Sequence, residues 1–189
     1  PATAAGHFFR AQALVRHRPD EAKLSFEKAT LAQGGYAQAL LHLARAHNHW
    51  TYHHRRDERF SETERLLRNA CDLQPGKAYP RYLLSLAYRM SGEINRAEGR
   101  DETLTTSRFK KALENALSAQ KNEYENLLGY AAEAEYRESL QEFENAISVR
   151  TKYEPLCKAP NELIDLYQYR WRDYYWVGRL DQAAADLTK

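Results

Sequence analysis

The sequence contains few cysteines, glycines and prolines: two, eight and six in a chain of 189 residues. Two cysteines, Cys71 and Cys157, cannot build the disulfide framework of a small secreted protein, which favours a reducing, cytoplasmic location. β-Branched residues are scarce, which counts against a sheet protein. The longest apolar run, residues 127–132, is far shorter than the ~20 residues of a membrane span, and no signal peptide is recognisable. We therefore do not expect a membrane protein, a secreted protein or a fibrous protein.

Charge is abundant but nearly balanced over the whole chain. Hydrophobic residues make up 43% and charged residues 29%, with a net charge of +2. Residues 1–60 carry nine Lys and Arg against five Asp and Glu, together with all seven histidines. A basic end attracts polyanions, although a mild asymmetry is also typical of an ordinary solvated surface. Both interpretations stay open at this point.

Apolar residues recur at helical spacing along nearly the whole chain, and the spacing itself repeats. Residues 78–97 carry Leu84, Tyr88, Gly92 and Ala97 at relative positions 7, 11, 15 and 20. This is the spacing of a tetratricopeptide repeat, a helix–turn–helix unit of about 34 residues. Other units match through Ala22, Phe26 and Ala29; Ala70 and Pro75; Tyr130, Tyr136, Phe143 and Ala146; and Tyr174, Gly178 and Ala183.

The repeats predict an all-α, right-handed solenoid of about five helix–turn–helix units, forming a single domain over residues 1–189. Small residues at positions 8, 20 and 27 let paired helices approach closely. Gly92 and Gly178 are expected to end the first helices of their units. Extra residues at 48–60, 92–108 and 149–162 make the array irregular. Because Lys189 falls inside a helix, we expect the chain to be part of a longer protein.

In stacked repeats the first helix of each unit faces the inner surface, chiefly through positions 2, 5, 9, 12 and 13. The second to fifth units place there Gln38, Leu41, Arg45, Asn48 and His49; Tyr79, Tyr82, Leu86, Arg89 and Met90; Lys121, Tyr124, Leu128, Ala131 and Ala132; and Asp165, Gln168, Arg172, Tyr175 and Trp176. Only Asp165 is acidic. The other carboxylates, such as those within residues 135–145, are expected on outer helix faces, where they aid solubility.

Cations interleaved with aromatic rings suit single-stranded RNA, because phosphates pair with the cations and bases stack on the rings. The candidate phosphate-binding residues are Arg45, His49, Arg89, Lys121 and Arg172, and the candidate stacking residues are Tyr79, Tyr82, Tyr124, Tyr175 and Trp176. Alternatively, these rings serve ordinary packing between repeats.

Catalytic and metal signatures are missing from the sequence. It has no GxxxxGK, GxGxxG or GxSxG motif, so we expect neither an enzyme nor a cofactor. His49 and His53 are spaced to share one helix face, but nothing nearby completes a set of four zinc ligands. Cys71 lies in an apolar stripe and is expected to be buried and inert, whereas Cys157 lies in a loop.

Beyond the superfamily, the chain resembles the interferon-induced proteins with tetratricopeptide repeats. The resemblance rests on YLLSLAYR at residues 82–89, FKKALENAL at 109–117, YRESLQEFENAI at 136–147 and the aromatic helix at 165–187. It implies a cytosolic antiviral effector of innate immunity that captures the 5′ end of foreign RNA in a basic tunnel. Arg89 matches a basic position of that family, whereas Tyr82, Leu83 and Arg170 depart from it.

The alternative function is a protein-interaction scaffold whose groove takes a peptide or a partner helix. The carboxylate clamp of Hsp90 co-chaperones is missing, since its positions carry His7, Ala11, His42, Tyr79 and Leu83. A different peptide ligand, including an acidic one, remains a possible occupant of the groove. Self-association through the irregular ends is a further possibility.

Overall fold

The computed structural model describes residues 3–14, 17–32, 38, 40, 42–45, 47, 58, 60–122 and 127–189. Within these residues it contains helices and no β-strand, which confirms the all-α class. The elements are α1 (Ala4–Leu14), α2 (Pro19–Ala32), α4 (Phe60–Leu73), α5 (Ala78–Ala97), α6 (Glu102–Asn122), α7 (Leu127–Ser139), α8 (Phe143–Tyr153), the 3-10 helix η1 (Glu154–Leu156), α9 (Pro160–Trp176) and α10 (Leu180–Leu187). Residues 38, 40, 42–45 and 47, which precede α4, are helical as well.

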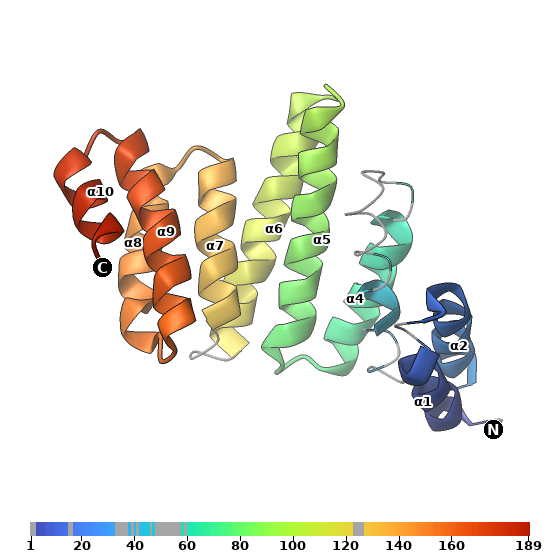
Figure 1. Cartoon of the computed structure of the whole chain (residues 1–189). Coiled ribbons are helices and arrows are strands. Elements are labelled where there is room, and N and C mark those ends of the chain that lie inside the picture. Colours follow the sequence, from blue (N-terminus) through green and yellow to red (C-terminus); the bar gives the residue numbers. More distant parts are fainter. Residues whose placement is uncertain are drawn as a thin grey trace.

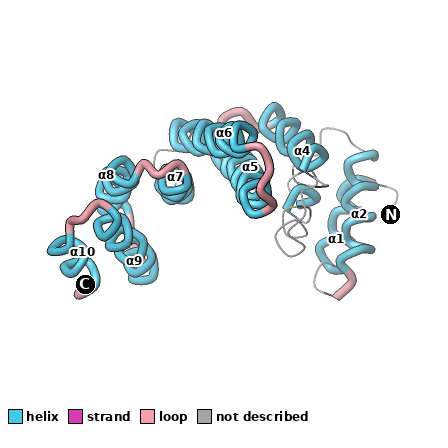
Figure 2. The backbone as a smooth tube through the Cα atoms, turned by 90° about the horizontal axis from the view of Figure 1, so that it is seen from above, coloured by secondary structure: helices cyan, strands magenta, loops and turns pink. Residues whose placement is uncertain are grey.

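Consecutive helices pack against each other as a row of upright hairpins (Figure 1). The pairs α1–α2, α5–α6, α7–α8 and α9–α10 each form one unit, and α4 is the second helix of a further unit. Seen from above, the row is an open arc with α1, α5, α7 and α9 in its inner layer and α2, α6, α8 and α10 in its outer layer (Figure 2). The predicted solenoid of about five units is therefore confirmed.

The core runs along the arc as two clusters of apolar side chains. The larger cluster extends from Phe8 in α1 to Tyr136 in α7, and the smaller one joins α7, α8 and α9 around Leu166. Five alanines expected at small repeat positions are buried in the structure: Ala22, Ala29, Ala70, Ala146 and Ala183. Small side chains at these places allow the close helix packing on which the hairpins depend.

Three tyrosines from repeat positions serve the packing, as the repeat pattern predicts. Tyr88, Tyr130 and Tyr136 are nearly inaccessible to solvent. The hydroxyl of Tyr136 lies 2.9 Å from the Ser85 hydroxyl, which links α7 to α5. The Tyr88 hydroxyl donates to Glu64 and accepts from Arg68, which links α5 to α4. These partners let the ring be buried without leaving its hydroxyl unsatisfied.

The third unit differs from the expected one at its glycine. Gly92 does not end a helix, because α5 continues to Ala97. A Cβ atom on Gly92 would lie 3.1 Å from the Phe109 ring, so the glycine permits close contact between α5 and α6. The turn uses Gly99 instead, at φ 64°. Residues 92–108 therefore lengthen the α5–α6 hairpin, and only Gly178, at φ 79° after α9, ends a helix as predicted.

The fourth unit begins later than the sequence spacing indicates. Repeat positions 2 and 5 at Lys121 and Tyr124 place the start of the first helix at residue 120, but α6 continues to Asn122 and α7 starts at Leu127. Lys121 consequently lies in the last turn of an outer helix. Tyr136 lies in α7, the first helix of the unit, rather than in the second. Of the residues predicted for the inner surface of this unit, Leu128 and Ala131 therefore lie on the inner helix α7, whereas Lys121 does not.

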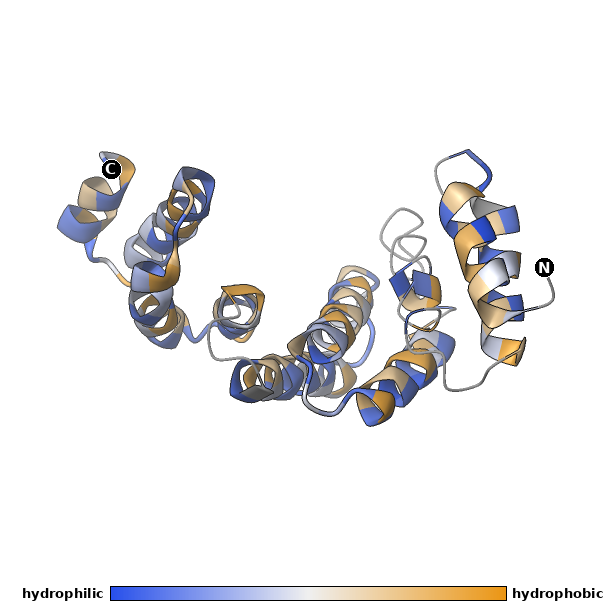
Figure 3. Ribbon diagram, turned by 90° about the horizontal axis from the view of Figure 1, so that it is seen from below, coloured by the Kyte–Doolittle hydropathy of each residue, from blue (hydrophilic) through white to orange (hydrophobic). Residues whose placement is uncertain are grey.

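Hydrophilic and hydrophobic residues are mixed along the helices (Figure 3). Among the residues that the structure describes, none of the helices has an apolar stretch that could cross a bilayer.

Candidate functional site

The inner face of α5 carries the first group of predicted binding residues. Tyr79 and Tyr82 lie side by side with ring centroids 6.4 Å apart. Tyr79 is 36% exposed, whereas Tyr82 is half-buried, and burial raises the pKa of its phenol. Arg89 lies two turns further along the same helix and is only partly exposed. The three residues therefore lie on α5, a helix of the inner layer of the arc (Figure 2).

Arg89 is already bonded to carboxylates. It forms an ion pair with Glu135 of α7 and a second one, 3.4 Å long, with Glu93 of α5. Its guanidinium also lies 6.0 Å from the centroid of the Tyr136 ring. Both the charge and the donors of this arginine are thus shared between two helices of the protein itself.

Arg172 is engaged in the same way on α9. It donates to Glu138 of α7 over 2.7 Å, and its guanidinium lies 5.2 Å from the centroid of the Tyr169 ring. Glu138 also pairs with Arg150, whose side chain is 1% exposed and binds Asp173 as well. Two arginines and two carboxylates therefore form one network that joins α7, α8 and α9.

The charge of Asp173 is unfavourable in this network. Burial raises the pKa of its carboxyl to about 7, and the negative Glu138 contributes in the same direction, whereas Arg150 opposes both. Arg150 also pairs with Glu138.

The acidic residues of α7 are the part of this site that the sequence reasoning missed. Glu135 and Glu138 were expected on an outer helix face, but they bond to cations of the inner helices α5 and α9. The late start of α7 explains the error, because Glu135 and Glu138 then fall at positions 9 and 12 of the unit. In this register Leu128 and Ala131 take positions 2 and 5, and the two carboxylates take positions 9 and 12, where Leu128 and Ala131 were predicted.

The remaining predicted residues that the structure describes lie on different helices. Arg45 is exposed in the short helical segment 42–45, and Lys121 is exposed on α6. Tyr175 and Trp176 are 56% and 63% exposed, and Trp176 stacks on Phe143 at 6.0 Å. His49 and Tyr124 lie outside the described residues.

A hollow of about 270 Å³ lies between the inner helices α7 and α9, with α8 beneath it. Its lining residues are Leu127, Leu128, Ala131 and Glu135 of α7; Arg150 and Tyr153 of α8; Cys157; and Glu162, Asp165, Leu166 and Tyr169 of α9. Most of these side chains are apolar or aromatic, and three are acidic. Three of the lining residues, Leu128, Ala131 and Asp165, were placed on the inner surface by the repeat positions.

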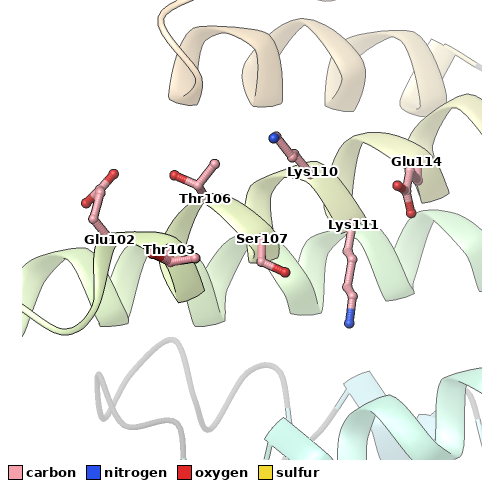
Figure 4. Close-up of a pocket in the computed structure, with 7 residues that line it drawn as sticks. All are labelled: Glu102, Thr103, Thr106, Ser107, Lys110, Lys111 and Glu114. Atoms are coloured by element: carbon pink, nitrogen blue, oxygen red, sulfur yellow. The ribbon is translucent and has the colours of Figure 1, made fainter.

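A second, larger hollow of about 590 Å³ is lined by one helix only. Its residues are Glu102, Thr103, Thr106, Ser107, Lys110, Lys111 and Glu114 of α6. Lys110 and Lys111 point to opposite sides of this helix (Figure 4). Side chains that diverge in this way do not converge on one ligand, so this hollow is the weaker candidate.

Nothing in the described part of the chain indicates catalysis or a metal site. No group of three or more His, Cys, Asp or Glu side chains is placed there to hold a metal ion. The proposed His49–His53 pair lies outside the described residues. Cys71 is buried, and burial raises the pKa of its thiol. Burial raises the pKa of the Cys157 thiol as well, so neither cysteine is an activated nucleophile.

Comparison with known proteins supports the fold at low sequence identity. No family model matches the chain. No curated protein sequence matches it either. Among solved structures it is similar to TTC0263, a tetratricopeptide-repeat protein of Thermus thermophilus, with 17% identity, a TM-score of 0.71, and 97% of this chain and 87% of that chain covered.

Two further solved structures are similar to a comparable degree. MamA from Desulfovibrio magneticus RS-1 has 14% identity and a TM-score of 0.72, over 98% of this chain and 91% of that chain. Human IFIT1, solved as a dimer with m7Gppp-AAAA, has 13% identity and a TM-score of 0.62, over 97% of this chain and 48% of that chain. IFIT1 is thus one of several proteins whose fold is similar to that of this chain. Sequence identities this low show a tetratricopeptide-like fold and nothing more specific.

Proposed function

We propose that this protein is a non-enzymatic interaction scaffold, whose inner surface binds a peptide or a helix of a partner protein. The observation that carries the proposal is the pairing of Arg89 and Arg172, two cations of the inner helices, with Glu135 and Glu138 of α7. A surface whose cations are internally neutralised has lost the electrostatic attraction on which RNA binding depends.

The electrostatic cost of placing a phosphate at these arginines favours a protein ligand over RNA. A phosphate at Arg89 would either displace Glu135 or lie beside it, and at Arg172 it would meet Glu138. Like charges within a few ångströms repel each other, and the repulsion grows where water is partly excluded. Neutral or basic peptide side chains and backbone amides carry no such penalty.

The shape of the molecule also suits a protein ligand. Solenoids of stacked repeats bind partners along their extended concave surface. Here the inner helices α7 and α9 border a largely apolar hollow with the exposed Leu128 and Tyr169 at its edge. Exposed apolar residues next to a concavity are typical of protein-interaction sites.

RNA binding with an antiviral role is the second candidate. It is favoured by the exposure of Tyr79, Tyr175 and Trp176, three rings that could stack bases, and of the cation Arg45. The fold similarity to IFIT1 adds nothing specific, because it is shared with other repeat proteins.

A peptide-display screen followed by hydrogen exchange tests the proposal. Random peptides are selected against the immobilised protein, and the selected peptides are synthesised and added to the free protein. We expect their binding to slow amide exchange in the inner helices α5, α7 and α9 more than in the outer helices α6, α8 and α10. Peptides that protect only outer helices, or a screen without binders, would contradict an inner-surface scaffold.

A pair of leucine variants serves as the control for this screen. Leu128→Ser removes an exposed apolar side chain at the hollow, and Leu104→Ser removes one with similar exposure from the outer helix α6. Losing a leucine contact costs about 1–2 kcal/mol, so Leu128→Ser should weaken peptide binding about tenfold. Leu104→Ser should leave the affinity unchanged.

A further inference from the structure

The hollow between α7 and α9 is framed by one face of each helix. On α7 the lining residues Leu127, Ala131 and Glu135 recur every four residues, and on α9 Glu162, Leu166 and Tyr169 recur at helical spacing. Both helices thus present a continuous strip to the space between them. A partner side chain that enters from the inner surface would be contacted from two sides.

The apolar part of the lining sets the kind of side chain that fits. Its apolar and aromatic residues are Leu127, Leu128, Ala131, Tyr153, Leu166 and Tyr169. The volume of about 270 Å³ lies just below the range of small-molecule pockets, about 300–1,000 Å³. A hollow of this size suits one long side chain with a neighbouring apolar residue.

The charges around the hollow leave it net negative. The lining contains one cation, Arg150, and three carboxylates, and Arg150 at the floor also pairs with Glu138, which does not line the hollow. Glu135 shares its charge with Arg89. Asp165 is exposed and, among the described residues, has neither an ion pair nor a hydrogen bond, so its charge is available to a ligand.

Glu162 is the third carboxylate of the lining. It accepts hydrogen bonds from the backbone N–H groups of Lys158 and Ala159 over 2.8 and 2.9 Å. The bonds from Ala159 and Lys158 lower the pKa of its carboxyl, so it remains ionised. The ammonium of Lys158 contributes weakly to this shift, and that side chain is not part of the lining.

We infer that the α7–α9 hollow binds a lysine or arginine side chain of the partner, flanked by an apolar residue, and that Asp165 is its main ionic contact. The inference rests on the proposed function and names the chemistry of the ligand. The long stem of a basic side chain packs along the apolar lining while its charged end stays at the acidic rim. An acidic peptide, which the sequence left open, would instead meet three carboxylates.

Three capped peptides that differ at one residue test this inference. They have the sequence Ala-Leu-X-Leu-Ala, with lysine, glutamine or glutamate at X, and binding is followed by NMR chemical-shift titration of the isotope-labelled protein. We expect the lysine peptide to shift residues of α7 and α9 and to bind about tenfold more tightly than the glutamine peptide. The glutamate peptide should bind most weakly.

A matched pair of aspartate variants assigns the charge effect. Asp165→Asn should weaken the lysine peptide about threefold and leave the glutamine peptide unchanged, since an exposed ion pair makes only a modest contribution. Asp181→Asn neutralises an exposed aspartate of the outer helix α10. This variant should change the affinity of neither the lysine nor the glutamine peptide. Both sites are exposed, so the variants should fold as the natural chain does.

The outcomes separate this inference from the proposed function. Equal binding of the lysine and glutamine peptides, or a lysine preference unaffected by Asp165→Asn, would overturn the inference while the inner-surface scaffold stands. Shifts confined to outer helices, with display-selected peptides also bound there, would overturn both.

Discussion

Buried charges hold the C-terminal helices together. Arg150 and Asp173 are 1% and 0% exposed and join α8 to α9. Arg170 is 5% exposed and joins α9 to α10 through Asp186, over 2.7 Å. Removing Arg170 would leave the buried carboxylate of Asp186 without this partner, which costs about 3–5 kcal/mol. Individual residues in this part of the arc therefore affect the stability of a whole hairpin.

Asp173 makes the stability of the protein depend on pH. Its folded-state pKa of about 7 lies above the ordinary value of 3.8, so the folded protein binds this proton more tightly than the unfolded chain. The contribution of this group to the free energy of unfolding is present at acidic pH and decreases as the pH rises from about 4 to 7, by up to about 1.4 kcal/mol per pH unit. Urea unfolding at about pH 5 and about pH 7 measures it.

Asp173→Asn is the matched variant, because an amide cannot titrate. Between the two pH values the natural protein should lose more stability than the variant, by up to about 2 kcal/mol. The opposite sign, or equal pH dependence, would contradict the raised pKa. If the variant does not fold, NMR titration of the Asp173 carboxyl in the natural protein gives the same answer.

At the scale of the helix, the sequence predicts the type of element better than its start. The fourth unit shows why: Tyr130 and Ala146 fit large and small repeat positions both in the expected register and in the one that the structure shows. The two registers differ by about two helical turns, so the same face stays buried in both. Only the end of α6 at Asn122 and the start of α7 at Leu127 distinguish them.

The α5–α6 hairpin offers a direct test of helix packing. Gly92→Val should lower the free energy of unfolding by about 2 kcal/mol, because the new side chain would overlap Phe109, which is fully buried. Urea unfolding of the variant and the natural protein measures the difference.

Gly76→Val provides the control for this substitution. Gly76 lies in the exposed turn before α5, and a Cβ atom there meets nothing within 4 Å. The free energy of unfolding of the Gly76→Val variant should stay within about 0.5 kcal/mol of that of the natural protein. Equal stability of the two variants would contradict a close contact at Gly92.

At the scale of the whole molecule, the arc places residues of neighbouring units side by side. Arg89 and Arg172 lie on α5 and α9, two helices of the inner layer (Figure 2), and repeat positions determine which layer a helix joins. Their partners were not foreseen, since Glu135 and Glu138 belong to another unit and no local sequence pattern links them. The cations are thus predictable from the sequence, whereas their neutralisation depends on how neighbouring units stack.

The most direct test of this neutralised inner surface is a titration of labelled oligo-uridine RNA at about 50 and about 200 mM salt. RNA held by the five predicted cations, Arg45, His49, Arg89, Lys121 and Arg172, would lose about a hundredfold in affinity between these conditions. We predict weak RNA binding at both salt concentrations. The double variant Arg89→Ala and Arg172→Ala should leave this affinity unchanged. Tight binding at low salt that this double variant abolishes, while combined Arg65→Ala and Arg100→Ala does not, would contradict the account.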